Sequence, residues 1–262
     1  MIQETFRNRR KPLKTITRYL FVCTMILLLI ACAGGKKAEK GDKAISIEEH
    51  FRLGFDAAGR GNLEEAVSEY EKVLKLDSKH SRAHLNLGIV YGRLGKWKEE
   101  ISEYKKVIRI DPNFAEAHFN LGVAYSERGN LKETAAQYQK ALQINPNYVE
   151  AHNNLGGIYF RTGKMDEALS EYQKAVEIKP DYARGYYNLG NVYRQKRKLD
   201  EAITSFQRAL QIHPKYAEAH YNLALIYYEK QEFDLAIEHS DAAGRLGIVV
   251  APAFLDRLKP YR

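Results

Sequence analysis

Apolar residues recur along residues 47–250 at the spacing of amphipathic helices. In one segment Leu155, Ile158 and Tyr159 follow one another at i, i+3 and i+4, which places them on one side of a helix. The next segment carries a second stripe at helical spacing: Ala168, Leu169, Tyr172, Ala175 and Val176. Nothing alternates with a period of two, so strands are not expected. The pattern predicts pairs of amphipathic helices, each of about a dozen residues.

The helix pairs repeat with a period of 34 residues. A glycine that follows a leucine marks the period: Gly54, Gly88, Gly122, Gly156 and Gly190, with Ala224 in the sixth place. A tyrosine recurs three residues further on: Tyr91, Tyr125, Tyr159, Tyr193 and Tyr227. A fixed period of this size indicates one supersecondary unit stacked on copies of itself. Such a chain presents an extended surface rather than an enclosed pocket, so we expect a binding function.

Glycine and proline mark the turns within and between the repeats. A glycine in the middle of four repeats predicts a turn between two helices, because glycine adopts the left-handed conformation at little cost: Gly61, Gly95, Gly129 and Gly163. A proline near the end of four repeats predicts the turn to the next one: Pro112, Pro146, Pro180 and Pro214. The six predicted repeats are 47–80, 81–114, 115–148, 149–182, 183–216 and 217–250.

These residues resemble the motif of the tetratricopeptide repeat (TPR) family, which is W-x2-L-G-x2-Y, then A-x3-F, then P over 34 residues. The fourth repeat has these residues in the motif's places: His152, Leu155, Gly156, Tyr159, Ala168, Tyr172 and Pro180. The resemblance covers nearly the whole chain after residue 46. It implies an all-α solenoid, a right-handed superhelix of six helix-turn-helix repeats, with residues 251–262 as a short C-terminal capping helix.

Small residues are expected where two helices of a repeat cross closely. We expect Gly156 to face Ala168, and Tyr172 to fill the gap toward the next repeat. We number the places of each repeat from 1 at its first residue. Glu100 and Thr134 replace the small residue at place 20 of their repeats. Those two helix pairs are therefore expected to sit slightly apart.

The N-terminal segment has the pattern of a secretory signal. A basic stretch to Arg18 precedes 14 mostly apolar residues, 20–33. As a helix these residues rise about 21 Å, short of the ~30 Å hydrocarbon core, although an uncleaved anchor is the alternative. The last residues, Leu29 to Cys32, resemble the lipobox of bacterial lipoproteins, which implies a signal peptide over 1–31 and acylation of Cys32. Residues 32–46 are then expected to form a flexible tether to the membrane.

The bulk charge argues against a nucleic-acid partner. The chain has 41 basic and 33 acidic residues, a formal net charge of +8. Residues 1–31 hold six of the basic residues and one of the acidic residues, so the remainder carries only about +3. A nucleic-acid binder needs clustered positive charge.

The sequence lacks the usual signatures of catalysis. It has no glycine-rich phosphate loop, G-x-S-x-G or H-E-x-x-H motif. Both cysteines, Cys23 and Cys32, precede the repeats, so no thiol chemistry is expected there. We expect no enzymatic activity, cofactor or small-molecule substrate. A histidine recurs at place 4 in His84, His118, His152 and His220, and we interpret it as a packing residue rather than a metal ligand, because the copies lie one per repeat.

An asparagine recurs at place 6 of five repeats: Asn86, Asn120, Asn154, Asn188 and Asn222. Asparagine is a mediocre helix former, so its repetition requires a reason. In the TPR family this place lines the concave face, where an amide can bond an extended peptide backbone. Arginine and tyrosine, which often carry binding energy, fall on the same face: Arg93, Arg161, Arg194, Tyr187 and Tyr221. The lysine of the family's carboxylate-clamp subset is absent at place 5, so acidic C-terminal tails are not assigned as the ligand.

The combined patterns predict a membrane-anchored scaffold that binds partner proteins or peptides in the concave groove. The lipobox resemblance implies the periplasmic side of a cell envelope, with the outer membrane favoured over the inner one. Roles in envelope assembly, pilus biogenesis (as a pilotin) or secretion are the family-level expectation. Two alternatives remain open. The repeats also resemble the non-catalytic repeats of O-linked N-acetylglucosamine transferases, and the chain could be a cytosolic co-chaperone with an uncleaved anchor.

Overall fold

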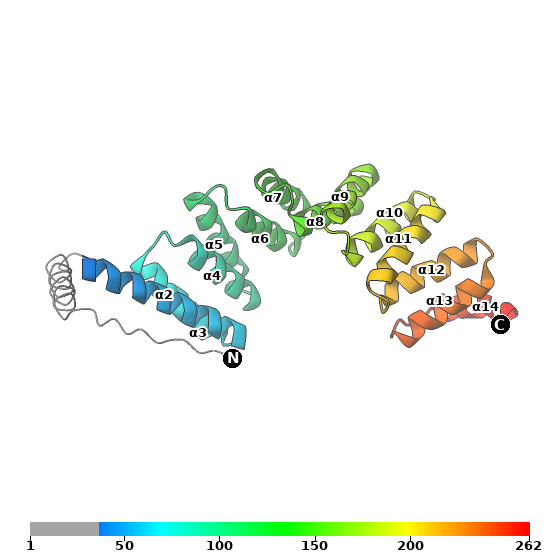
Figure 1. Ribbon diagram of the computed structural model, residues 1–262, viewed down its shortest axis with the longest axis horizontal. Coiled ribbons are helices and arrows are strands. Elements are labelled where there is room, and N and C mark those ends of the chain that lie inside the picture. Colours follow the sequence, from blue (N-terminus) through cyan, green and yellow to red (C-terminus); the bar gives the residue numbers. More distant parts are fainter. Residues whose placement is uncertain (1–36) are drawn as a thin grey trace, which may run out of the picture. The chain divides into compact units, whose positions relative to one another are not determined.

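The computed structural model describes residues 37–262, with side chains described from residue 47 onward. Every regular element in this range is a helix, drawn in colour in Figure 1. The prediction of an all-α fold is confirmed. The predicted signal segment 1–31 and Cys32 lie outside the described residues.

The chain divides into two compact parts, residues 1–83 and residues 84–262, which we describe separately. In the first part α2 (Lys37–Arg60) packs against α3 (Leu63–Leu76). Buried side chains on both helices form its core: Ala57, Ala66, Tyr70 and Val73.

Helix α2 begins at Lys37, within the segment for which a flexible tether was expected. Residues 37–46 are helical and continue without a break into the first repeat. Lysine, alanine and glutamate are good helix formers, which favours a helix over these residues. Within residues 37–262 no helix combines the length and apolar character that a membrane span needs.

The second part begins inside α4 and contains the rest of the chain. Its helices are α4 (Ser81–Arg93), α5 (Trp97–Ile110), α6 (Ala115–Ser126), α7 (Leu131–Ile144), α8 (Val149–Arg161), α9 (Met165–Ile178), α10 (Ala183–Gln195), α11 (Leu199–Ile212), α12 (Ala217–Glu229), α13 (Phe233–Arg245) and α14 (Pro252–Leu258), followed by the short 3-10 helix η1 (Lys259–Tyr261). Each helix from α5 to α13 contacts the next one along the chain, as the ribbon in Figure 1 shows. The part is therefore a stack of helix pairs, as expected of an α-solenoid.

The turns inside the repeats use the left-handed conformation that the glycines predicted. Their φ angles are +87° at Gly61, +70° at Gly95, +73° at Gly129 and +78° at Gly163. The fifth and sixth repeats place Arg197 (φ 60°) and Gln231 (φ 64°) at the same position. A side chain in this conformation costs about 1–2 kcal/mol, so these two turns are less stable than their counterparts.

The residue that lies nearest to Gly156 across the helix crossing is Tyr172. A Cβ on Gly156 would lie 2.8 Å from Tyr172 Cε1, while the predicted contact between Gly156 and Ala168 stays a prediction. The ring thus fills the space between the two helices of its own repeat. The other repeats with this glycine use the same arrangement, in the pairs Gly54–Tyr70, Gly88–Tyr104, Gly122–Tyr138 and Gly190–Phe206.

The two large residues at place 20 are accommodated by their neighbours. Glu100 is buried, and a Cβ added to Gly92 would lie only 2.8 Å from the carboxylate oxygen Oε1 of Glu100. Arg128 of the next repeat approaches Glu100 at 3.4 Å. Burial nevertheless raises the pKa of Glu100 against the lowering effect of Arg128. Thr134 is fully buried, and its hydroxyl donates to the carbonyl of Asn130 at 2.9 Å.

The C-terminal helix α14 caps the last repeat. Phe254 and Leu258 are buried against α12 and α13, in one apolar cluster with Leu223 and Ala243. A terminal repeat needs such a cover because it has no further copy to bury its apolar side.

Candidate functional site

The first helices of three successive repeats line one pocket of about 410 Å³, which we call the α8 pocket. Most of its lining residues lie on α6, α8 and α10, and α7 and α9 each add one tyrosine, Tyr138 and Tyr172. Its lining residues are Val123, Ser126, Glu127, Tyr138, Asn153, Asn154, Gly157, Ile158, Phe160, Arg161, Tyr172, Arg184 and Asn188. Three predicted site residues, Asn154, Asn188 and Arg161, are therefore brought together.

A chain of hydrogen-bonded side chains crosses the α8 pocket from α10 to α7. Asn188 Nδ2 donates to Asn153 Oδ1 at 2.7 Å, and Asn153 Nδ2 donates to Asn154 Oδ1 at 3.3 Å. Asn154 Nδ2 in turn donates to the Tyr138 hydroxyl at 3.4 Å. The network fixes the amide of Asn188 relative to that of Asn154. A preorganised set of polar groups binds a ligand with little loss of side-chain entropy.

The network leaves hydrogen-bonding capacity for a ligand. An asparagine side chain has two N–H donors and two acceptor lone pairs. Asn188 uses one donor in this network, and it is half-buried rather than fully enclosed. Asn153 was not among the predicted site residues. It is 3% exposed, and it is hydrogen-bonded to both Asn188 and Asn154.

The charge in the α8 pocket is predominantly positive. Arg161 and Arg184 are exposed, and among the described residues neither forms an ion pair. The pocket's one carboxylate, on Glu127, already lies 3.7 Å from Arg128. Burial raises the pKa of Tyr172 to about 12, so its phenol stays neutral at physiological pH. The pocket therefore offers two guanidinium groups, neutral amides and neutral phenols.

The other predicted residues lie outside the α8 pocket. Asn222 is 7% exposed and donates to the Tyr187 hydroxyl and to Asn191 Oδ1, each at 3.4 Å. It thus joins α12 to α10. The Tyr187 ring stacks on Tyr216 at 4.8 Å, and the Tyr221 ring meets Phe254 of the cap edge-on at 6.3 Å. The side chains of these three residues, which were predicted to contact a ligand, thus make contacts within the protein.

The remaining predicted residues occupy neighbouring helices. Asn86 and Arg93 lie on α4, Asn120 on α6 and Arg194 on α10. None of these four lines the α8 pocket.

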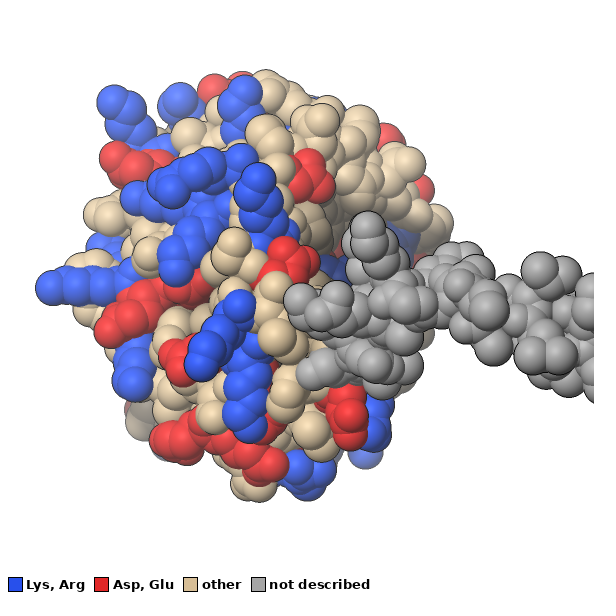
Figure 2. All heavy atoms as spheres, turned by 90° about the vertical axis from the view of Figure 1, so that its left-hand side faces the viewer, with Lys and Arg blue, Asp and Glu red and all other residues tan. Residues whose placement is uncertain are grey.

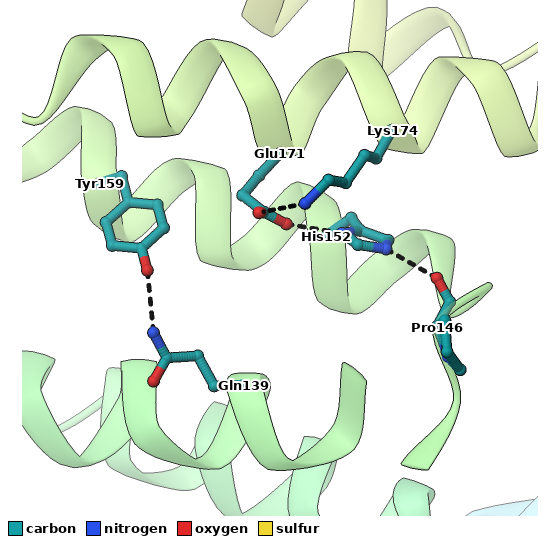
Figure 3. Close-up of polar contacts among 6 residues, drawn as sticks. All are labelled: Gln139, Pro146, His152, Tyr159, Glu171 and Lys174. Carbon is teal, nitrogen blue, oxygen red and sulfur yellow. Dashed lines mark hydrogen bonds and ion pairs between the residues drawn. The ribbon is translucent and has the colours of Figure 1, made fainter. Parts of the chain in front are cut away.

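The recurring histidines make a second set of polar contacts, shown for the fourth repeat in Figure 3. His152 Nδ1 lies 2.6 Å from Glu171 Oε2, and its Nε2 lies 2.8 Å from the carbonyl of Pro146. Lys174 donates to the other oxygen of Glu171 at 2.9 Å. Burial tends to raise the pKa of Glu171, but the hydrogen bonds from His152 and Lys174 outweigh it and lower that pKa.

This arrangement recurs across 19 residues in other repeats, in the pairs His50–Glu69, His84–Glu103 and His118–Gln137. Each of these hydrogen bonds connects the two helices of one repeat. In the second, third and fourth repeats the histidine is also buried, so the predicted packing role is confirmed, and the hydrogen bonds are an addition that sequence reasoning missed. The signal was present, because an acceptor recurs at place 23 whenever histidine stands at place 4 in the first four repeats.

A larger hollow of about 690 Å³ lies on the other side of the stack, between α7 and α9. Its polar groups are mostly bonded to each other. Gln139 donates to the Tyr159 hydroxyl at 2.9 Å, beside the His152–Glu171 contact (Figure 3). Because these groups are already satisfied, we regard the smaller α8 pocket as the better candidate for ligand recognition.

The charge on the face drawn in Figure 2 is mixed. Lys and Arg side chains are interspersed with Asp and Glu there. On this face such intermixing produces no field of a single sign.

The comparisons with known proteins agree with the 34-residue period. The profile of the TPR repeat matches residues 59–95, 93–129, 124–163, 157–196 and 190–231, which together span more than half of the chain. A comparison with curated proteins gave no match.

Solved structures with a similar arrangement of helices include MamA, PilF and YrrB. MamA is 31% identical with a TM-score of 0.58, over 66% of this chain and 94% of the MamA chain. PilF of Pseudomonas aeruginosa is 18% identical with a TM-score of 0.73, over 84% of this chain and 100% of PilF. YrrB, a TPR protein with an unusual peptide-binding site, is 21% identical with a TM-score of 0.61, over 73% and 97% of the two chains. With its repeats matched by sequence and by structure, the chain belongs to the tetratricopeptide repeat family.

Proposed function

We propose that the protein is a non-catalytic scaffold that holds an extended segment of a partner protein in the α8 pocket. Tetratricopeptide repeats form scaffolds for protein–protein interaction, and stacked repeats present extended surfaces suited to that role. The observation that carries the proposal is the Asn188–Asn153–Asn154 network, which spans two repeats and positions amides beside Arg161 and Arg184.

The dimensions of the α8 pocket suit a short extended peptide. It is lined by the first helices of three successive repeats, and packed helices lie about 10 Å apart. A segment that crosses all three helices therefore covers roughly 20 Å, the length of about six extended residues. Amides can bond the peptide backbone whatever its sequence, because each offers both donors and acceptors.

The charge of the α8 pocket sets a preference among such segments. The pocket contains two exposed guanidinium groups and one carboxylate, which is already paired with Arg128. A partner segment with aspartate or glutamate side chains gains charge-assisted hydrogen bonds there, whereas a basic segment is repelled.

A quantitative capture experiment tests the proposal. The parent protein, an Asn154→Ala/Asn188→Ala variant and an Asn147→Ala control are used to capture proteins from a membrane extract of the source cells. Asn147 is exposed and lines the hollow between α7 and α9, so the control reports on the opposite side of the stack. We expect a partner that the double variant loses and the control retains, with unchanged helical content by circular dichroism. Equal recovery by all three proteins would contradict the proposal.

We further propose that the scaffold is attached to a membrane through an acylated Cys32, on the export side of a cell envelope, with a role in envelope assembly, pilus biogenesis or secretion. The support is the Leu-Ile-Ala-Cys sequence at the end of a short apolar segment. More than one acyl chain would hold the protein firmly, because a single chain anchors only marginally. Replacement of Cys32 by alanine is expected to release the protein into the soluble fraction and to change its electrophoretic mobility. An unchanged distribution and mobility would refute this attachment.

A further inference from the structure

The sixth repeat replaces an acceptor with a second histidine. In the first, second and fourth repeats the histidine at place 4 meets a glutamate, with Nδ1 2.6 Å from the carboxylate in each case. In the third repeat it meets Gln137 at 2.8 Å. In the sixth repeat His220 Nδ1 lies 2.8 Å from His239 Nδ1. The four histidine contacts of the first four repeats can therefore be compared directly with the histidine–histidine contact of the sixth repeat.

The second nitrogen of His220 determines the protonation of the pair. His220 Nε2 lies 3.1 Å from the carbonyl of Pro214, which can only accept, so Nε2 carries a proton. When His220 is neutral, its Nδ1 has no proton and accepts one hydrogen bond from His239 Nδ1–H. The two rings then share a single proton along the contact.

Acid affects this contact in the opposite sense from the histidine–glutamate contacts. A protonated histidine beside a carboxylate gains an ion pair. In the sixth repeat one added proton can be accommodated, because one ring can be charged and donate from Nδ1 while Nδ1 of the other ring accepts, but a second added proton sets two N–H groups against each other across 2.8 Å. The fully protonated pair therefore cannot keep this geometry.

The surroundings of the pair supply little compensation. The His239 ring on α13 stacks on Tyr227 of α12, with ring centroids 5.5 Å apart and planes inclined by 11°. Tyr227 is neutral and accepts a hydrogen bond from Gln207 of α11. Within residues 47–262 no carboxylate is hydrogen-bonded to either ring. Burial and then His220 lower the pKa of His239, and the neighbouring Glu238 opposes them only in part.

We infer that the sixth repeat is an acid-sensitive end of the stack, in which protonation of the His220–His239 pair opens α12 and α13 while the third and fourth repeats stay closed. Each repeat contacts only its neighbours, so a terminal repeat can open without the rest. Opening would break the bonds from Asn222 to Tyr187 and Asn191. If the proposed function holds, acid would thereby alter the partner-binding face at its α10 end.

The sign of the effect follows from proton linkage. In the open repeat His239 takes up a proton near the ordinary histidine pKa of about 6.5, whereas burial and the His220 contact lower the pKa of His239 in the closed repeat. The closed state is therefore fully stable above that pH and loses stability as the pH falls. If the closed repeat binds one proton fewer than the open repeat, the equilibrium constant for opening rises about tenfold for each pH unit by which the pH falls.

Hydrogen exchange of the full chain between pH 7.5 and pH 5 tests the inference, with rates expressed as protection factors to remove the intrinsic pH dependence. Protection in Ala217–Arg245 is expected to fall about tenfold per pH unit below pH 6.5, while protection in Val149–Ile178 changes much less. An equal slope in the two segments would overturn the inference.

Two variants that exchange the contacts of the third and sixth repeats provide controls. His239→Gln recreates the contact of the third repeat and should remove the steep acid dependence from α12 and α13. Gln137→His recreates the contact of the sixth repeat and should introduce that dependence into α6 and α7. The inference fails if His239→Gln keeps the steep slope, or if folded Gln137→His shows none. None of these readouts requires a partner, so failure here is separate from failure of the proposed binding function.

Discussion

Two adjacent glycines in α8 are predicted to respond in opposite directions to the same substitution. A Cβ at Gly156 would lie 2.8 Å and 2.9 Å from Tyr172 ring carbons, closer than such atoms normally approach. A Cβ at Gly157 would meet only the Tyr172 hydroxyl, at 3.6 Å, which is an ordinary contact. Both positions are helical, so alanine gains about 1 kcal/mol of helix propensity over glycine at each.

The packing cost decides the sign at each position. Overpacking of a close contact costs about 1–3 kcal/mol, which outweighs the propensity gain at Gly156. We expect Gly156→Ala to destabilise the protein by about 1 kcal/mol and Gly156→Leu to destabilise it further. Gly157→Ala should stabilise it by about 0.5–1 kcal/mol. For a chain of this size the two alanine variants should differ by roughly 4–8 °C in Tm.

Urea and thermal unfolding followed by circular dichroism measure this difference. A double-mutant cycle with Tyr172→Leu identifies the cause, because removing the ring should relieve most of the penalty at Gly156. If both alanine variants shift stability in the same direction, or if the cycle shows no coupling, the assigned glycine–ring packing is incorrect.

Three further predictions follow from other contacts. Gln231→Gly should raise the free energy of unfolding by about 0.5–1 kcal/mol, because glycine relieves the positive φ there; a lower or unchanged unfolding midpoint would count against this. The lowered pKa of Glu171 means that its contact with His152 stabilises the fold above about pH 4.5 and is lost as the pH falls, so Glu171→Gln should flatten the loss of stability between pH 5 and pH 3. Equal slopes for variant and parent in acid titrations would exclude that contribution. Charge reversal of Arg161 and Arg184 should weaken binding of an acidic partner peptide and reduce its salt dependence in fluorescence anisotropy, and unaltered salt dependence would show that the peptide lies elsewhere.

The repeat period predicts the fold well because it reports on helix faces and turns. The starts of α6, α8, α10 and α12 fall on the first residues of the predicted repeats. The turn glycines were predictable because their conformation depends on local sterics alone. Positions 197 and 231 show that the turn persists when glycine is absent, since the packed helices on both sides determine it.

The partners of individual side chains were harder to predict because they depend on the angles between helices. The spacing of Gly156, Ala168 and Tyr172 shows that they share an interface, but not that the Tyr172 ring lies nearest to the glycine. In the same way, the recurrence of asparagine at place 6 does not reveal that Asn188 bonds to Asn153 of the preceding repeat. Contacts between repeats thus decide which asparagines remain available to a ligand.

The side-chain amide signals of the asparagines provide the most direct test of the binding site. With a captured partner segment in hand, its titration is followed by nuclear magnetic resonance of the isotopically labelled protein. The account predicts that the amide signals of Asn153, Asn154 and Asn188 shift together at one affinity, while that of Asn147 stays in place. Shifts confined to Asn147 and Gln139, on the opposite side of the stack, would contradict it.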